Sequence, residues 1–157
     1  MKQDNKCCSC DIRNTILNSV EKLIKRYGYK KMTMDDIAHE SGIGKGTIYL
    51  YFPSKEEVSL SWIDRSNKKL RDQLQKIADS DTDIKLKLKN MLISRVMTRF
   101  DQAQGMVESL DELFSTIRST LLSRRDQYLK LEADLFAKVI DEGSKQGVFT
   151  FDNSRST

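Results

Sequence analysis

The chain has 157 residues, of which 38% are hydrophobic, 32% charged and 8% aromatic. This composition excludes wholesale disorder, because it is polar enough to dissolve and apolar enough to bury a core. With one proline and seven glycines, a turn-rich β-sandwich is not expected. No apolar run approaches the ~18–20 residues of a membrane span and no secretion signal is visible, so we expect a cytoplasmic protein with no membrane partner.

The net charge of +4 is concentrated in the first third of the chain. Residues 1–55 contain ten Lys and Arg against six Asp and Glu, whereas residues 56–157 contain seventeen of each. A local basic excess favours a module that binds phosphates.

All three cysteines fall in one short cluster, Cys7, Cys8 and Cys10. An odd count in an intracellular chain argues against a disulfide framework. The C-C-x-C spacing lacks the paired ligands of a structural zinc site, and His39 is the only histidine. We therefore expect residues 1–10 to form a flexible N-terminal arm that binds no metal, with a redox or metal sensor as the alternative.

Helical periodicity begins with an apolar stripe from Ile12 to Tyr27, and Gly28 follows where a left-handed residue would end a helix. Thr33 to Asp36 fits a capping box that opens a second, short helix, which Gly42 ends. A third helix is predicted to begin near Gly44 or Lys45. It must end at Phe52, because Pro53 forbids continuation.

The rest of the chain is also predicted to be helical. A second capping pattern at residues 54–57 opens a long helix, and an acidic loop at residues 79–83 ends it. The next helix, over residues 84–100, is amphipathic, with apolar residues spaced by fours at Leu88, Leu92, Val96 and Phe100. Further segments follow around residues 110–117 and 128–140, and Gly143 and Gly147 close the last one. Because no stretch alternates strictly, we predict an all-α fold.

Residues 33–55 have the pattern of a helix-turn-helix unit. At 100° per residue, Ile48 and Phe52 share an edge of the third helix that must face the core. Gly46, Thr47 and Leu50 lie opposite, where they could approach base edges. The flanks of this face carry long side chains that could reach phosphates, namely Lys45 and Tyr49 on one side and Tyr51 on the other, with Lys55 on the next helix.

Lys45 and Lys55 both stand at predicted helix N-termini, where the helix dipole disfavours a cation. An anionic partner would explain both positions. The alternative from the residues alone is a small helical bundle with an ordinary solvated surface.

Residues 33–38 read T-M-D-D-I-A and residues 42–57 read G-I-G-K-G-T-I-Y-L-Y-F-P-S-K-E-E. With the Y-G-Y turn at residues 27–29, these motifs resemble the DNA-binding domain of the TetR family of bacterial transcriptional regulators over about residues 11–65. The resemblance implies a three-helix DNA-binding head joined by a long helix to a helical bundle. The candidate DNA contacts are Thr33, Lys45, Gly46, Thr47, Tyr49, Leu50, Tyr51 and Lys55.

The resemblance divides the chain into the arm, a DNA-binding domain over residues 11–62, and an effector-binding and dimerisation domain over residues 63–157. Two residues depart from the family pattern: Gly44 stands where Ser or Thr is common, and Tyr51 where His is frequent. Family members usually continue for two further helices after a stretch like E-G-x-x-x-G-x-F at residues 142–149. We therefore expect a naturally short or a truncated chain, whose dimer would use the helix over 84–100 or, preferably, the last long helix.

The leading hypothesis is a sequence-specific, ligand-responsive repressor that binds a palindromic operator as a homodimer. Its small-molecule effector, of unknown identity, would occupy a pocket among Met91, Met97, Phe100, Met106, Phe114 and Tyr128. The alternative is a constitutive or architectural DNA-binding protein without a pocket. We expect no enzyme, cofactor or metal site, because no Walker loop, nucleophile elbow or paired metal motif is present.

Overall fold

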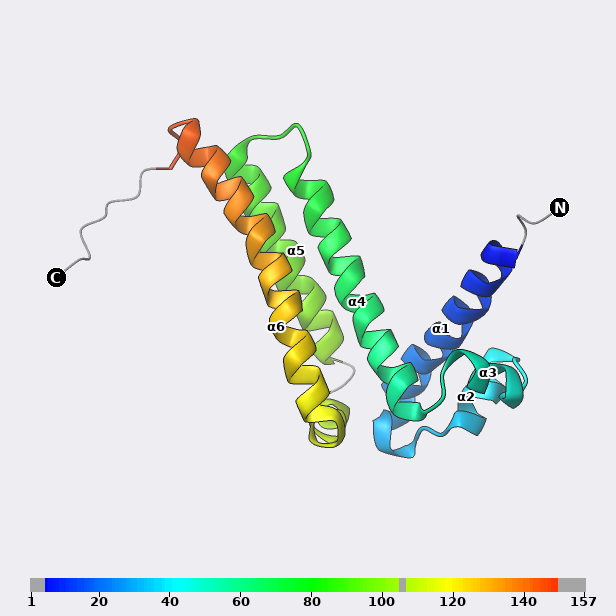
Figure 1. The fold of residues 1–157 in the computed structure, drawn as a ribbon. Coiled ribbons are helices and arrows are strands. Elements are labelled where there is room, and N and C mark those ends of the chain that lie inside the picture. The colour runs from blue at the N-terminus through cyan, green and yellow to red at the C-terminus, as the bar shows by residue number, and fades with distance from the viewer. Residues whose placement is uncertain (1–4, 105–106, 150–157) are drawn as a thin grey trace. The chain divides into compact units, whose positions relative to one another are not determined.

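The computed structural model of the protein describes residues 5–104 and 107–149, and the side chains of residues 11–100, 122 and 124–149. This described part consists of six helices and contains no strand, which confirms the all-α prediction (Figure 1). In chain order the helices are α1 (Asn5–Lys31), α2 (Met34–Ser41), α3 (Lys45–Tyr51), α4 (Lys55–Ala78), α5 (Ile84–Gln104) and α6 (Val107–Lys145).

The chain divides into two compact units. The first unit contains residues 1–66 and 101–122, and the second contains residues 67–100 and 123–157. Each unit has its own cluster of buried apolar side chains. The assignment of separate DNA-binding and effector-binding domains stays a prediction.

The first unit has the predicted order of short helices around a buried core. Gly28 has a φ of 80° and a ψ of 165°, so it breaks the helical geometry of α1, and one more helical turn follows to Lys31. The core joins α1 to the following helices through completely or almost completely buried side chains. Its largest members include Ile16, Ile24, Tyr29, Met32, Ile37, Phe52 and Trp62.

The predicted flexible arm is wrong for residues 5–10, because α1 already begins at Asn5. Cys7, Cys8 and Cys10 therefore belong to the first turns of a helix, although their side chains lie outside the described set. The apolar stripe that locates the helix starts only at Ile12. Polar residues ahead of such a stripe give no periodic signal, even where the backbone is helical.

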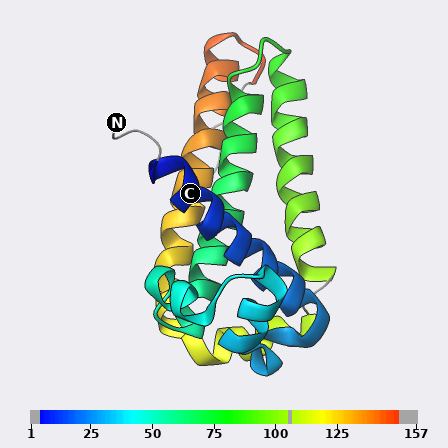
Figure 2. The ribbon, with the colours of Figure 1, turned by 90° about the vertical axis from the view of Figure 1, so that its right-hand side faces the viewer.

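In the second unit, segments of α4, α5 and α6 lie side by side (Figures 1 and 2). Their shared core includes Leu70 and Leu74 of α4, Met91 of α5 and Val139 of α6, each at most 1% exposed. Leu135 and Phe136 of α6 also pack against it.

The predicted apolar face of α5 is only partly used. Leu88 packs against the core of the second unit, but Leu92, Val96 and Phe100 are each at least 50% exposed. The residues of α5 that are buried are Ile84, Lys87, Met91 and Ser94. Spacing by fours thus identified a helix, but it did not identify the side that faces the core, because α5 carries apolar residues on both sides.

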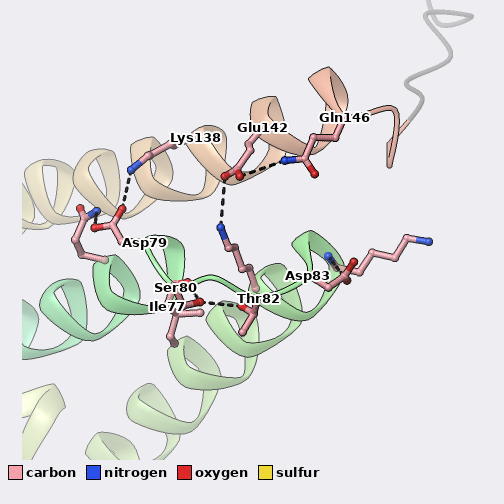
Figure 3. A network of polar contacts seen from close by, with 11 residues as sticks. Ile77, Asp79, Ser80, Thr82, Asp83, Lys138, Glu142 and Gln146 are labelled. Atoms are coloured by element: carbon pink, nitrogen blue, oxygen red, sulfur yellow. Dashed lines mark hydrogen bonds and ion pairs between the residues drawn. The ribbon is translucent and has the colours of Figure 1, made fainter.

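Polar contacts hold the ends of the second unit's helices together (Figure 3). Asp79, directly after α4, pairs with Lys138 of α6 at 2.8 Å, and Lys87 of α5 pairs with Glu142 of α6 at 3.6 Å. Asp83 caps α5 by accepting hydrogen bonds from the backbone N–H groups of residues 85 and 86. Two of the three loop aspartates therefore have structural partners.

The C-terminus of α6 explains the two glycines of the E-G-x-x-x-G-x-F stretch. Gly147 has a φ of 71°, and its N–H donates to Ser144 O at 3.1 Å. The next N–H, of Val148, reaches back to Gly143 O at 2.8 Å, which completes a Schellman motif. A Cβ on Gly143 would lie 2.5 Å from the Phe149 ring and 2.8 Å from Ile84, so this position needs a glycine for close packing.

Gly143→Ala is therefore expected to destabilise the second unit by about 1–3 kcal/mol, because the added methyl group overpacks this contact. Urea denaturation followed by far-UV circular dichroism measures the change. In a Phe149→Ala background most of the loss should disappear, since the ring that the methyl group strikes is gone. A Gly143→Ala protein as stable as the wild type would contradict the close packing of Phe149.

Candidate nucleic-acid interface

The short helix α2 begins at a capping box and ends at a glycine. Thr33 Oγ1 accepts a hydrogen bond from Asp36 N at 3.2 Å, and Asp36 Oδ2 accepts one from Thr33 N at 2.9 Å. This is the predicted capping box, and it lowers the pKa of Asp36 through the hydrogen bonds from Thr33. Gly42 then takes the left-handed conformation, with a φ of 67°, and ends α2. Ile43 packs against the core and fixes the angle between the two helices.

The two faces of α3 are sharply different. Ile48 and Phe52 are 0% exposed, so the rotation predicted for this helix is correct. On the opposite face Leu50 is 85% exposed, and on the flank Tyr49 is 43% exposed. A large apolar side chain that is so fully in solvent contributes nothing to the core, and it is available to another molecule.

The two glycines of α3 leave its N-terminal half open. Gly44 is the N-cap and, having no side chain, makes no capping hydrogen bond. A Cβ placed on Gly46 would find no atom within 4 Å. The fold therefore does not require glycine at position 46, but a partner that approaches the helix backbone closely would.

Lys45 has a partner that the sequence did not indicate. Its Nζ lies 2.6 Å from Asp35 Oδ1 of α2, and both side chains are more than half exposed. The hydrogen bond to Asp35 and the charge of Asp35 raise the pKa of Lys45. An exposed pair of this kind is weak and is easily exchanged for another anion.

Two further predicted contacts, Thr33 and Tyr51, also have roles within the first unit. The Thr33 hydroxyl donates to Asp36 Oδ2 at 2.7 Å as part of the cap. Tyr51 is half-buried and packs against the core. Thr47 is also half-buried, whereas Gly46 and Leu50 lie exposed beside it. DNA contacts by all of these residues stay predictions.

Lys55 stands in the first turn of α4, where it binds the end of α1. Its Nζ donates to Lys30 O at 3.2 Å and lies 4.3 Å from the centre of the Tyr29 ring. Tyr29 in turn donates from its hydroxyl to Glu56 Oε1 at 3.4 Å. Burial, followed by the charge of Glu56, raises the pKa of Tyr29 to about 12.

The raised pKa of Tyr29 predicts that the stability of the protein falls at alkaline pH. The folded protein holds the Tyr29 proton up to about pH 12, whereas the unfolded chain releases it near pH 10. Its contribution to stability is therefore present below pH 10 and is lost as the pH rises towards 12. Absorbance at 295 nm should detect a phenol that titrates near pH 12 and disappears in Tyr29→Phe. Glu56→Gln should lower this pKa, and an unchanged value would contradict the role of the carboxylate.

Sequence reasoning missed two arginines that hold the first unit together. The Arg13 guanidinium lies 4.4 Å from the centre of the Phe52 ring, and its Nη2 donates to Ser61 Oγ at 3.2 Å. Arg65 of α4 donates to Asn18 Oδ1 of α1 at 2.9 Å and lies 3.5 Å from Glu21. Arginines on otherwise polar helix faces carry no pattern that would have predicted these contacts.

The predicted pocket residues have different environments. Met91 is 0% exposed in the core of the second unit, whereas Met97 and Phe100 are about half exposed on another side of α5. Tyr128 is half-buried on α6. Met106 and the side chain of Phe114 lie outside the described residues. A pocket made by these six residues stays a prediction.

Within the described ranges, no group of three or more His, Cys, Asp or Glu side chains is placed to hold a metal ion. In the same part of the chain, no helix is both long enough and apolar enough to cross a membrane.

A short capped helix, a left-handed glycine turn and a second helix with an exposed outer face define a DNA-binding helix-turn-helix. Residues 16–60 match the family model of the bacterial regulatory proteins, tetR family. The chain is 44% identical over 50 residues to the HTH-type transcriptional regulator YhgD of Bacillus subtilis. This matched segment covers 32% of this chain and 26% of YhgD. It is 27% identical over 144 residues to YfiR of the same organism, covering 85% of this chain and 66% of YfiR.

A transcriptional regulator from Cytophaga hutchinsonii has a similar solved structure, with a TM-score of 0.76 and 26% identity. This match covers 89% of the present chain and 70% of that protein. The chain thus spans less than two thirds of the length of the curated relatives named above. Residues 16–60 thus form a helix-turn-helix of the TetR family of bacterial transcriptional regulators, and the fold of the chain resembles that of a solved transcriptional regulator.

Proposed function

We propose that the protein is a repressor that binds its operator through the outer face of α3. The observation that supports this most strongly is the difference between the two faces of α3. Ile48 and Phe52 are completely buried, whereas Leu50 is 85% exposed. A helix of this size enters the major groove, where base edges can be distinguished by hydrogen bonds and apolar contacts.

The residues of this face have different proposed roles. Gly46, Thr47 and Leu50 approach the base edges, since they are small or apolar and lie opposite the buried edge. Lys45 and Tyr49 contact phosphates, which fixes the register of the helix without reading sequence. Lys55 adds a cation at the start of α4, where free backbone N–H groups also attract a phosphate.

One such head contacts only a few base pairs, so we infer that two copies bind one palindrome. The two half-sites would be separated by about 10 base pairs or a multiple, because the two heads then face the same side of the DNA. A repressor of this kind acts in the cytoplasm, where bacterial DNA is found.

The test is selection of bound DNA from a random pool. The wild-type protein should enrich an inverted repeat with this spacing. Leu50→Glu is the matched control, because Leu50 is so exposed that its replacement should leave the fold intact while placing a negative charge against the bases. If the wild type enriches no sequence more strongly than Leu50→Glu does, α3 is not the recognition helix.

Control by a small-molecule effector is a separate part of the proposal, and one observation favours a constitutive alternative. Met97 and Phe100, two of the six residues predicted to line a pocket, are about half exposed on α5. Release of the selected DNA on adding the small-molecule fraction of a bacterial lysate would support an effector. DNA binding that this fraction leaves unchanged would favour constitutive repression.

A further inference from the structure

Two lysines at the end of α1 differ from the other cations of the first unit. Lys30 and Lys31 are exposed, and neither side chain makes an ion pair with any described residue. Two neighbouring positive charges without a counter-charge attract an anion from solution. The other Lys and Arg side chains between residues 11 and 66 all contact a carboxylate, an aromatic ring or another polar group. They are Arg13, Lys22, Lys25, Arg26, Lys45, Lys55 and Arg65.

A third lysine lies directly beside this pair. Lys55 Nζ, at the start of α4, donates to Lys30 O at 3.2 Å and lies 4.3 Å from the centre of the Tyr29 ring. An ammonium group has three N–H donors, and the Lys30 oxygen accepts from one of them. The neighbouring carboxylate of Glu56 accepts a hydrogen bond from the Tyr29 hydroxyl at 3.4 Å. Lys55 is therefore held in place while it keeps donors for a further acceptor.

The three lysines lie close to the proposed recognition helix. Lys31 precedes Asp35 by four residues, and Asp35 Oδ1 lies 2.6 Å from Lys45 Nζ at the start of α3. Four residues span at most about 14 Å, even when they are fully extended. The major groove is about 12 Å wide. When α3 enters this groove, long lysine side chains at the end of α1 can therefore reach the phosphates that border it.

We propose that Lys30, Lys31 and Lys55 form one phosphate-binding site for the DNA backbone beside the half-site that α3 reads. We name it the α1–α4 site. Lys30 and Lys31 are not among the DNA contacts expected from the sequence. The proposal rests on the proposed function, because it places the site next to a recognition helix in the major groove. Since phosphate contacts carry no sequence information, the site adds affinity and fixes the register of α3.

The helix dipole offers the same lysines a purely structural role, because it favours cations at a helix C-terminus. The break at Gly28 makes this role small. The dipole is a sum over aligned peptide groups, and only one helical turn follows Gly28. A structural role would lower the melting temperature when the lysines are removed, but it would leave the salt dependence of DNA binding unchanged.

The first test measures binding to a duplex of random sequence over a range of salt concentrations. Each lost phosphate contact lowers the slope of the logarithm of affinity against the logarithm of salt concentration by about 0.9. The double variant Lys30→Ala/Lys31→Ala should therefore lower this slope by about 1–2, and its affinity at low salt should fall about tenfold or more. An unchanged slope would overturn the proposal. The melting temperature of the variant identifies any loss of folding.

The matched control is Lys22→Ala/Lys25→Ala, which removes the same charge from the same helix. Lys22 and Lys25 pair with Glu40 and Glu21 at 3.2 and 2.9 Å, so their charges are already compensated. This control should lower the slope by less than ~0.5, because it removes no phosphate contact. An equal loss of slope in both double variants would show that only net charge matters, and it would overturn the proposal.

The second test locates the contacts on an operator obtained by selection. Single phosphates are replaced, one at a time, by neutral methylphosphonates. At the phosphates that the α1–α4 site binds, this replacement should weaken wild-type binding several-fold but should not weaken Lys30→Ala/Lys31→Ala further. Lys45→Ala should lose its sensitivity at different phosphates. If the Lys30→Ala/Lys31→Ala protein keeps the wild-type sensitivity at every phosphate, the proposal is wrong.

Failure of the α1–α4 site is distinguishable from failure of the proposed function, because the first test needs no operator. If the wild type selects an operator while the double variant at Lys30 and Lys31 keeps the full salt slope, the repressor proposal stands and the α1–α4 site is wrong. If the slope falls in this variant but the wild type selects no sequence, the lysines bind phosphates and α3 is not the recognition helix.

Discussion

Phe52→Ala is expected to lower the free energy of unfolding of the first unit by about 3–5 kcal/mol. The Phe52 side chain is 0% exposed, packs in the core beside Ile48, and carries the Arg13 guanidinium over its ring. Truncation would leave a cavity and would also remove this cation–π contact. Because small domains have total stabilities of only about 5–15 kcal/mol, a large part of the first unit's stability depends on this one ring.

Trp62 makes the measurement specific. It is the only tryptophan in the chain and is 4% exposed in the same core, so its fluorescence reports unfolding of the first unit alone. Urea denaturation of wild type and Phe52→Ala then gives the difference directly. Tyr49→Ala is the control, since Tyr49 is 43% exposed on a flank of α3 and should change stability by less than ~0.5 kcal/mol. Equal losses in both variants would show that the rotation of α3 is wrong.

The backbone of residues 33–52 could be predicted because local chemistry fixes it. Thr33 with Asp36 forms a cap wherever the sequence places them before an apolar run, and Gly42 supplies the left-handed turn. Ile48 and Phe52 are four residues apart, so one face of a short helix had to be buried. Each of these predictions depends on residues fewer than ten positions apart, and each was confirmed.

What could not be predicted depends on residues distant in sequence or on ambiguous patterns. The pairing of Lys45 with Asp35 needs the angle between α2 and α3, which no local pattern contains. The contacts of Arg95 and Arg99 with Glu132 join residues more than thirty positions apart. The exposed side of α5 was misjudged because that helix is apolar on two sides, and only the packed neighbours decide which side is buried.

Lys45→Ala is expected to weaken binding to operator and to random DNA alike, by about tenfold at low salt, since a phosphate contact carries no sequence information. The slope of the logarithm of affinity against the logarithm of salt concentration should fall by about 0.9, the value for one lost contact. Thr47→Ala should instead relax preference at one base position and leave the salt slope unchanged. Fluorescence anisotropy with labelled duplexes over a range of salt measures all three quantities.

Asp35→Asn tests the same lysine through an expected gain in DNA affinity. In the free protein Asp35 holds Lys45 at 2.6 Å, so a phosphate must displace this carboxylate before it binds the lysine. Removing the negative charge should free Lys45 and also reduce repulsion of the DNA backbone, so affinity for every duplex should rise several-fold. The gain should shrink in the double variant with Lys45→Ala, because the part that acts through the lysine is lost. If Asp35→Asn weakens binding, or if its gain is the same with and without Lys45, then Asp35 does not compete with DNA for this lysine.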